Sequence, residues 1–459
     1  MRAISPIRLL VLGMLAWLGA QSAARADDWP QWLGPRRDAI WRESGIIEKL
    51  PKDGPKIRWR QKIGEGYAGP AVAGGKVYIT DRVLPDGTSN PKNPFGRSRT
   101  KGNERVLCLD EATGNILWKH EYDCPYEVSY ASGPRCTPLV DGDRVYTLGT
   151  MGDLLCLSTK DGKVLWSKNF PKDYKCDVPQ WGFAGHPLLE GDNLICLVGG
   201  EGSVAVAFDK MTGKEAWRAL SASEPGYAPP TIIEVAGKRQ LIIWHPQSVN
   251  CLDPKTGTVH WSFPFIGRKK DRLGAGMSIP TPRRDGDLLF LTCFYDGSLM
   301  LKLNGTEKPT QVWRSKSRSE RPDGTDSLHC VMNTPFIKDG FIYGVCSYGE
   351  LRCIKENTGK RVWESFKPIV GESMRWGNAF LVPQGDRVFL FNEGGDLIIA
   401  RLTPKGYEEI SRANILTPTN TMAAPAGRRV IWSHPAFANR CCYARNDREI
   451  VCVSLAAEN

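Results

Sequence analysis

One eleven-residue motif recurs along this chain at intervals close to fifty residues, and no other feature constrains the fold as strongly. Its clearest copy, CLDEATGNILW at 108–118, has an apolar run that ends in Asp, a Thr-Gly turn, and a second run that ends in Trp. Asp110 can accept hydrogen bonds from backbone N–H groups of the turn, and Gly114 can adopt the positive φ that closes it. The motif therefore predicts a β-hairpin whose second strand presents a large indole for burial.

The spacing of the copies predicts a propeller. Between the final residues of successive copies, from Trp118 to Ile410, the intervals are 48, 51, 44, 52, 50 and 47 residues. Two further strand-like segments precede each copy, so each repeat supplies four short strands. A period near fifty with four strands per repeat is typical of a β-propeller. The copy at 301–313 is degenerate, and the one at 400–410 has Ile410 where Trp is expected.

The two ends of the chain complement each other. Residues 431–455 contain three strand-like segments and lack a fourth, whereas IRWR at 57–60 stands alone before the first repeat and carries Trp59. We therefore expect the N-terminal strand to close the last blade, which leaves no open sheet edge between the first and last blades. The predicted fold is an all-β, eight-bladed propeller of four-stranded antiparallel blades over 57–459.

The first residues have the pattern of a signal peptide. Residues 1–26 have a basic start, a short apolar run at 9–20 and a small-x-small cleavage site at 24–26. Twelve apolar residues are too few to span a bilayer as a permanent helix. Because the first cysteine is Cys108, a lipid anchor at the cleavage site is not expected either. We predict a soluble protein exported to the periplasm or cell envelope.

The charge of the remaining chain is only mildly basic. Removing residues 1–26 takes away three arginines and no acid, so the net charge falls from +11 to +8 over 433 residues. Nucleic-acid binding would need such charge to be concentrated on one face. We therefore expect no nucleic-acid partner, and we expect a monomer.

Two segments interrupt or precede the repeats. Residues 27–56 carry three Trp among Pro, Gly and charged residues, and we expect this N-terminal extension to wrap around and pack on the outside of the propeller. The insertion at 83–103 is rich in Pro and Gly, and it is either a tolerated surface excursion or a docking loop for an acidic partner. Its charged residues are Asp86, Lys92, Arg97, Arg99 and Lys101.

The fourteen cysteines are mostly placed as small apolar residues. Five occupy one repeat position, where a buried thiol behaves as a hydrophobic side chain: Cys108, Cys156, Cys251, Cys353 and Cys452. Cys124, Cys176 and Cys330 lie in expected loops. A disulfide would involve these three, and Cys124–Cys176 is one pairing that the spacing allows.

A second periodic feature points to a binding site. An aromatic residue or Met appears just before the first strand of each repeat, usually three positions ahead of Pro. Because the innermost strands crowd around the axis, these side chains should form a ring at one mouth of the central channel. Such a ring either grips a planar ligand or an extended chain, or only plugs the channel. Its members are Tyr67, Tyr130, Trp181, Tyr227, Met277, Met332, Trp376 and Trp432.

The repeat resembles that of the pyrroloquinoline quinone (PQQ) type β-propellers, a family that includes quinoprotein dehydrogenases and the outer-membrane assembly lipoprotein BamB. The pattern Ala/Cys-x-Asp-x-x-Thr-Gly-x-x-x-Trp is matched at 108–118, 207–217 and 251–261, and the opening WPQWLGP is similar to that of exported members of this family. The resemblance implies that the repeat Trp docks between adjacent blades. The docking residues would be Trp59, Trp118, Trp166, Trp217, Trp261, Trp313 and Trp363.

The resemblance also implies two functions, a scaffold or an enzyme. A PQQ pocket would need a Trp floor, for which Trp181 or Trp376 is a candidate, and oxygen ligands for Ca²⁺. Candidate acids and amides near the blades' first strands are Asp177, Glu127, Glu372, Asn333 and Asn378. Cys441-Cys442 lies within an expected strand, where consecutive side chains point to opposite faces, unlike the vicinal disulfide of the quinoprotein dehydrogenases.

Other chemistries have weaker signals. His186, His329 and His434 precede first strands and could converge, although each can also satisfy a local hydrogen bond. No haem-attachment, nucleophile-elbow, zinc-protease or phosphate-loop motif is present. We predict a non-catalytic binding or interaction scaffold with no catalytic residue, metal or cofactor. Its partner would be an envelope protein or an extended or planar ligand, and a PQQ- and calcium-dependent alcohol or sugar dehydrogenase is the alternative.

Overall fold

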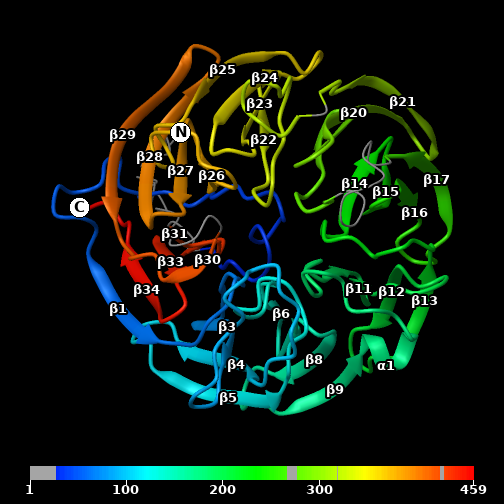
Figure 1. Ribbon diagram of the computed structural model, residues 1–459, viewed down its shortest axis with the longest axis vertical. Coiled ribbons are helices and arrows are strands. Elements are labelled where there is room, and N and C mark those ends of the chain that lie inside the picture. Colours follow the sequence, from blue (N-terminus) through cyan, green and yellow to red (C-terminus); the bar gives the residue numbers. More distant parts are fainter. Residues whose placement is uncertain (1–26, 266–276, 318, 424–427, 459) are drawn as a thin grey trace, which may run out of the picture.

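The repeats form blades because their middle strands are apolar on both faces. In β8 (Asp153–Ser158), for example, four consecutive residues are buried, since the blade is packed between two neighbours. The computed structural model describes residues 27–265, 277–317, 319–423 and 428–458. Within these residues, eight four-stranded antiparallel sheets are arranged in a ring around a common axis (Figure 1). The predicted all-β, eight-bladed fold is confirmed.

Blades 1 to 7 follow the chain in order. Blade 1 contains β2 (Ala71–Ala73), β3 (Lys76–Val83), β4 (Asn103–Asp110) and β5 (Ile116–Asp123); blade 2 contains β6 (Leu139–Asp141), β7 (Arg144–Leu148), β8 and β9 (Val164–Asn169). Blade 3 contains β10 (Leu188–Glu190), β11 (Asn193–Leu197), β12 (Ala205–Asp209) and β13 (Glu215–Ala219); blade 4 contains β14 (Thr231–Val235), β15 (Lys238–His245), β16 (Ser248–Leu252) and β17 (Val259–Pro264).

The second half of the ring repeats this order. Blade 5 contains β18 (Arg283–Asp285), β19 (Leu288–Cys293), β20 (Gly297–Asn304) and β21 (Glu307–Arg314); blade 6 contains β22 (Phe336–Lys338), β23 (Phe341–Val345), β24 (Leu351–Lys355) and β25 (Arg361–Ser365). Blade 7 contains β26 (Ala379–Gln384), β27 (Arg387–Asn392), β28 (Asp396–Thr403) and β29 (Gly406–Asn414). A short helix, α1 (Phe170–Tyr174), follows β9, and β30 (Asn420–Ala423) pairs with β31 (Arg428–Val430) before the last blade.

The eighth blade joins both ends of the chain. It contains β32 (Ala436–Ala438), β33 (Cys441–Arg445), β34 (Glu449–Ser454) and, as its outer strand, β1 (Ile57–Lys62). The antiparallel pairing of β1 with β34 runs from Ile57 opposite Val453 to Lys62 opposite Glu449. The expectation that the N-terminal strand completes the last blade is confirmed, and the ring is closed by backbone hydrogen bonds.

The repeat Trp residues contact the neighbouring blade. The indole N–H of Trp118, on blade 1, donates to the carbonyl of Thr159 in the β8–β9 turn of blade 2 at 3.2 Å. Gly162 of that turn lies under the ring, with φ at 72°, and a Cβ there would be 2.5 Å from Cε3 of Trp118. Glycine is thus needed in the Thr-Gly turn for two reasons: it adopts the positive φ, and its missing side chain leaves the space that the indole occupies.

The same indole-to-carbonyl contact recurs around the ring. The acceptors are Glu111 for Trp59, Lys210 for Trp166, Pro254 for Trp217, Glu356 for Trp313 and Thr403 for Trp363. Trp261 differs, because its indole N–H has no hydrogen-bond partner among the described residues and the next hairpin is the degenerate copy at 301–313. Trp363 keeps the contact although the turn after β28 lacks Thr-Gly, so the backbone carbonyl matters more than the motif.

The N-terminal extension packs on the propeller, from the channel end to the outer strand of blade 7, where Leu50 donates its backbone N–H to Ser411 Oγ. Its dark blue trace crosses the centre of the ring in Figure 1. Trp29 exchanges backbone hydrogen bonds with Val72 on blade 1, and Trp41 donates its backbone N–H to Pro383 on blade 7. Trp29, Trp32 and Trp41 are all buried. Trp29 and Trp41 belong to one apolar cluster that includes Val72 of blade 1, Phe389 of blade 7 and Phe437 of blade 8, so the extension joins three blades.

All fourteen cysteines are buried free thiols, so the disulfide that the sequence left open among Cys124, Cys176 and Cys330 is not present. Cys124 packs in an apolar cluster with Tyr126 and Val128, while burial raises the pKa of the Cys176 thiol to about 11. Cys441 and Cys442 lie in β33, as the sequence predicted, and remain unpaired.

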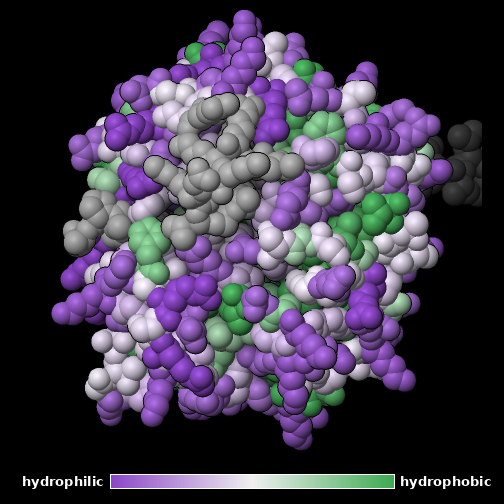
Figure 2. All heavy atoms as spheres, turned by 45° about the vertical axis from the view of Figure 1, so that its right-hand side comes forward, coloured by the Kyte–Doolittle hydropathy of each residue, from purple (hydrophilic) through white to green (hydrophobic). Residues whose placement is uncertain are grey.

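Two features outside the channel bear on the predicted export and partner binding. Residues 1–26, the predicted signal peptide, lie outside the described residues. In the described parts of the chain, no helix has the length and hydropathy needed to cross a membrane. Where the atoms in Figure 2 are coloured, hydrophilic side chains predominate and hydrophobic ones form small separate groups. Scattered apolar residues of this kind need no partner on the face that the figure shows.

Candidate functional site

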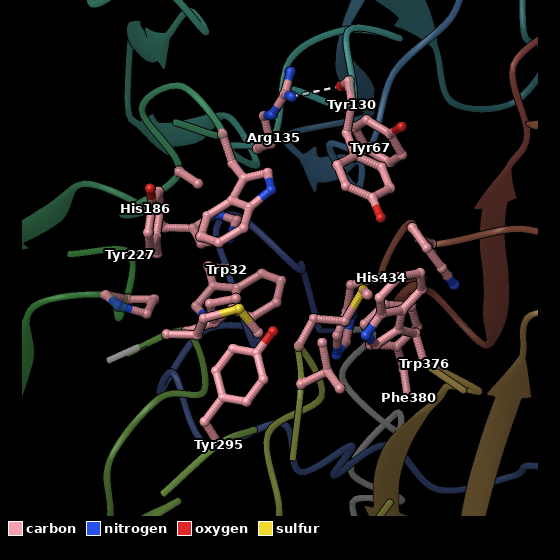
Figure 3. A pocket seen from close by; sticks show the side chains of 18 of the residues that line it. Trp32, Tyr67, Tyr130, Arg135, His186, Tyr227, Tyr295, Trp376, Phe380 and His434 are labelled. Carbon is pink, nitrogen blue, oxygen red and sulfur yellow. Dashed lines mark hydrogen bonds between the residues drawn. The ribbon is translucent and has the colours of Figure 1, made fainter. Parts of the chain in front are cut away.

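The structure brings all eight residues of the predicted ring to one cavity at a mouth of the channel. This cavity has a volume of about 210 Å³ and is lined by nineteen described residues, ten of them Phe, Tyr or Trp (Figure 3). Each blade contributes from the segment before its innermost strand, so the ring is a consequence of the eightfold repeat. The ring residues are Tyr67, Tyr130, Trp181, Tyr227, Met277, Met332, Trp376 and Trp432.

The floor of the cavity is a residue that the repeat pattern did not predict. Trp32, from the N-terminal extension, stacks on His186 with ring centroids 3.9 Å apart and meets the ring of His434 edge-on at 5.0 Å. Its indole N–H donates to Thr281 Oγ1 on blade 5 at 3.0 Å. Trp32 forms this floor, and Trp181 and Trp376, the floor candidates from the sequence, line the same cavity from blades 3 and 7.

Both floor histidines are neutral near pH 7. Burial lowers the pKa of His434 to about 4 and also lowers that of His186 far below its usual range. His186 accepts a hydrogen bond from the backbone N–H of Thr137 at 2.9 Å through Nδ1. His329 lies apart from this pair and contacts the Phe294 carbonyl at 3.1 Å. Each histidine thus satisfies a local hydrogen bond, and the described residues contain no His, Cys, Asp and Glu cluster that could hold a metal ion.

The walls are held by buried polar partners behind the rings. The indole N–H of Trp432 donates to Glu393 Oε2 at 3.1 Å. Glu393 is only 2% exposed, and burial raises its pKa although Arg428, 3.4 Å away, opposes that rise. On the opposite wall, Trp181 and Tyr227 make an edge-to-face contact at 5.4 Å. The rings are therefore oriented before any ligand arrives.

Two wall residues adopt a backbone conformation that side chains disfavour. Tyr130 and Trp376 have φ of 57° and 62°, in the left-handed region. Such residues cost roughly 1–3 kcal/mol each and persist only where the surroundings impose them. Tyr130 is held by its N–H bond to the Pro94 carbonyl at 2.7 Å and by Arg135, which donates to its carbonyl at 2.6 Å. Strain of this kind concentrates at functional sites.

The insertion at 83–103 reaches the rim of the cavity. Phe95 meets Tyr130 edge-to-face at 5.4 Å and Trp376 at 5.9 Å, so it bridges blades 2 and 7. It remains 41% exposed. Neither Phe95 nor Tyr295, another lining residue, follows the repeat, so only their aromatic character marked them in the sequence.

The charged side chain that lines the cavity already donates hydrogen bonds to other groups of the protein. Arg135 is the only lysine or arginine among the described lining residues, and its guanidinium donates to the carbonyls of Gly133, Ser129 and Tyr130. None of the described lining residues is Asp or Glu. The apolar wall is thus interrupted only by a guanidinium that already has acceptors.

The acids and amides considered for an enzyme do not line the cavity. Asp177 and Glu127 line a separate groove beside it. Asn333 and Asn378 are buried and hydrogen-bonded to each other at 3.2 Å, and Glu372 is exposed on a loop. The sequence placed all five near the blades' first strands, yet the side chains do not converge on the channel.

Comparison with known proteins identifies the repeat. Residues 102–365 and 245–459 match the model of a family described as outer membrane protein assembly factor BamB. The chain is 25% identical over 270 residues to quinohemoprotein alcohol dehydrogenase ADH IIB of Pseudomonas putida, covering 56% of this chain and 30% of that protein. It is 23% identical over 261 residues to BamB of Moranella endobia, covering 55% of this chain and 62% of the relative.

Solved structures share the architecture. BamB from Moraxella catarrhalis superposes with a TM-score of 0.56 at 14% identity, covering 87% of this chain and 99% of that chain. Quinohemoprotein alcohol dehydrogenase from Comamonas testosteroni superposes with a TM-score of 0.55 at 16% identity, covering 94% and 81%. These identities support the fold alone, and the aligned stretches span only 30%, 41% and 35% of three quinone-dependent relatives. Because the family model covers most of the chain and the blades have the same build, this chain belongs to the PQQ-repeat β-propeller family that includes BamB and is related to the quinoprotein dehydrogenases.

Proposed function

We propose that this protein is an exported, non-catalytic binding protein that holds an aromatic group of a partner at the channel mouth. The observation that supports this most is the cavity itself, with ten aromatic rings and no carboxylate among its described lining residues. Edge-to-face and offset contacts with such rings contribute about 0.5–1.5 kcal/mol each beyond the area they bury. A guest ring would meet several at once.

The volume of the cavity sets the size of the guest. At about 210 Å³, it exceeds the cavity of about 150 Å³ that accommodates benzene, and it is smaller than the roughly 300–1,000 Å³ of pockets for drug-sized ligands. One substituted ring, such as the side chain of Phe, Tyr or Trp, matches this space. The partner therefore presents a single aromatic group, and the rest of it lies outside the cavity.

The relatives named as quinone-dependent dehydrogenases suggest the second function, a PQQ- and calcium-dependent oxidation. The residues of the cavity do not suit that cofactor. Calcium takes six to eight oxygen ligands, with carboxylates prominent among them, and the described lining residues supply no Asp or Glu. We therefore derive no catalytic step. Binding of PQQ with Ca²⁺ at micromolar concentration, measured by the absorbance of the bound quinone, would overturn the binding-protein proposal.

A direct test titrates the chain with p-cresol, a single phenol ring, by calorimetry. We expect saturable binding that Ala184→Trp abolishes, because Ala184 lines the cavity and a Trp side chain would fill it. Ala112→Trp is the matched control, since Ala112 is exposed on the β4–β5 turn far from the cavity lining. Trp376→Ala should weaken binding by removing one wall. Equal p-cresol binding by the chain and Ala184→Trp would remove the cavity from consideration.

Export is part of the proposal and has separate support. Residues 1–26 have the basic, apolar and small-residue order of a signal peptide, and relatives are named for assembly of outer membrane proteins. We expect the secreted protein to begin at Asp27 and to sediment as a monomer. N-terminal sequencing of the protein from an envelope fraction, with analytical ultracentrifugation, tests both. An unprocessed N-terminus would contradict export through this signal.

A further inference from the structure

A polar groove lies beside the aromatic cavity. It has a volume of about 920 Å³ and lies between the loops that precede β10 and β14, next to the β11–β12 turn. Residues that are close in sequence line the two sites. Gln180 lines the groove and Trp181 lines the cavity, and Pro225 lines the groove two residues before Tyr227, which lines the cavity. Since one extended residue spans about 3.3–3.6 Å, a chain anchored in the cavity reaches the groove within a few residues.

One contact joins the two sites directly. Glu224, which lines the groove, accepts a hydrogen bond at 3.4 Å from the hydroxyl of Tyr227, which lines the cavity. At the rim, Phe95 lines the cavity and Arg97 the groove. The groove therefore lies within reach of a partner held by its aromatic group.

The groove is acidic. Its described lining contains four carboxylates, Glu127, Asp177, Glu201 and Glu224, against two cations, Arg97 and Lys175. Arg97 donates its Nε–H to the backbone carbonyl of Glu127 at 3.3 Å. Among the described residues, none of the four carboxylates forms an ion pair within 4.0 Å. They therefore present net negative charge to whatever lies in the groove.

The arginines around the mouth do not reverse this charge preference. Arg375 pairs with Glu320 at 2.5 Å and lies over the ring of Trp376, and Arg428 pairs with Glu393 at 3.4 Å. Arg135 donates to backbone carbonyls of its own loop. These cations are neutralised or saturated within the protein, whereas none of the four groove carboxylates has an ion-pair partner within 4.0 Å among the described residues.

We propose that the occupant is an extended peptide segment of a partner, with an aromatic side chain in the cavity and lysine or arginine residues two to four positions away in the groove. This inference rests on the proposed function, because it takes the cavity as the anchor for an aromatic group. The groove carboxylates add selection for positive charge. Exposed ion pairs are individually weak, so two lysines together should strengthen binding by about tenfold at low salt.

The test uses three heptapeptides with blocked ends, measured by calorimetry against the purified chain. The first has the sequence Lys-Lys-Gly-Phe-Gly-Lys-Lys, which offers positive charge in both chain directions. The second replaces each Lys with Glu, and the third replaces Phe with Ala. We expect the first to bind about tenfold more tightly than either of the others at 50 mM salt, with the charge preference lost at 1 M salt, where the Debye length is about 3 Å.

A double variant tests the groove. Asp177→Asn/Glu201→Gln removes two groove carboxylates and should reduce the Lys-over-Glu preference to about threefold or less. Asp143→Asn/Asp192→Asn is the control, since it removes the same charge from exposed residues that are not in the groove lining. Loss of the preference in both variants would show a long-range charge effect and overturn the proposed groove site.

The outcomes separate this inference from the function on which it rests. If both Phe peptides bind equally, the aromatic anchor stands and the basic segment is wrong. If the Lys peptides bind equally with Phe or Ala, attraction is by charge alone and the inference fails. If p-cresol and both Phe peptides all fail to bind, the proposed function fails as well.

Discussion

Replacing the glycine under a docked tryptophan measures how much the blade contact contributes to stability. Gly162 lies in the β8–β9 turn with φ at 72°, and a Cβ there would be 2.5 Å from Cε3 of Trp118 on blade 1. Gly142, in the β6–β7 turn of the same blade, has φ at 58° and nothing within 4 Å of its Cβ position. The two sites share the backbone requirement and differ in the neighbouring indole.

The difference between Gly162→Ala and Gly142→Ala isolates the indole contact. A left-handed conformation costs an L-residue roughly 1–2 kcal/mol, so Gly142→Ala should lower the free energy of unfolding by about that amount. Overpacking adds about 1–3 kcal/mol, so Gly162→Ala should lower it by about 2–5 kcal/mol. The clash is with the body of a ring whose N–H is bonded to Thr159, so the ring cannot turn aside without losing that bond.

Urea unfolding at constant temperature is the suitable assay. Roughly 2.1 cal/mol/K per residue for the unfolding entropy implies only about 1 °C of Tm change per kcal/mol in a chain of this length. Far-UV circular dichroism and Trp fluorescence should give coincident transitions before two-state analysis is applied. Equal losses for the two variants would refute the reasoning, because the indole would then contribute nothing at Gly162.

Three further predictions concern the cavity. Phe95→Ala should weaken p-cresol binding by about two- to tenfold, which is the effect of losing one aromatic contact. The free energy of unfolding in urea should stay nearly unchanged, because the ring is 41% exposed. Unchanged affinity would exclude Phe95 from the site. Thr281→Val should lower the free energy of unfolding by about 1–3 kcal/mol, because it leaves the buried indole N–H of Trp32 without an acceptor. A loss below about 0.5 kcal/mol, which is the usual effect of a neutral surface substitution, would contradict this hydrogen bond. The folded-state pKa of His434 is lowered to about 4 from 6.5, so the native state binds fewer protons than the unfolded chain between these values. Stability is therefore lost as the pH falls from 7 to 4, by about 3 kcal/mol from this residue. His434→Gln should reduce the difference in unfolding free energy between pH 7 and pH 4 by that amount, and an unchanged difference would argue against a buried neutral imidazole.

The propeller could be derived from sequence because its determinants are local and repeated. The Asp-x-x-Thr-Gly turn uses hydrogen bonds within a few residues: Asp110 Oδ1 accepts from the backbone N–H of Thr113 at 2.8 Å. The fifty-residue period then gives the number of blades, and the orphan strand at 57–60 gives the closure. The eight ring residues follow from the same logic, since each lies three to nine residues before an innermost strand.

The non-repeating segments could not be placed in this way. Trp32 has no periodic counterpart, and its position depends on where His186 and His434, 248 residues apart, come together at the channel end. The same holds for Phe95, whose insertion could as well have lain on the rim. The acids Asp177 and Glu127 were identified from sequence, but only their positions show that they face a groove and not the cavity.

Periodicity thus determined the number of blades, their closure and the residues around the channel, because these depend on short-range hydrogen bonding and on the regular alternation of apolar strands. The tertiary structure determined which residues form the floor and the rim of the cavity, the volume of the cavity and the charge of the groove beside it. Those features arise where segments distant in sequence meet, and their energetics depend on which side chains exclude water from one another. No local pattern encodes that information, so the function of the mouth rests on contacts such as Trp32 with His186 and Phe95 with Tyr130.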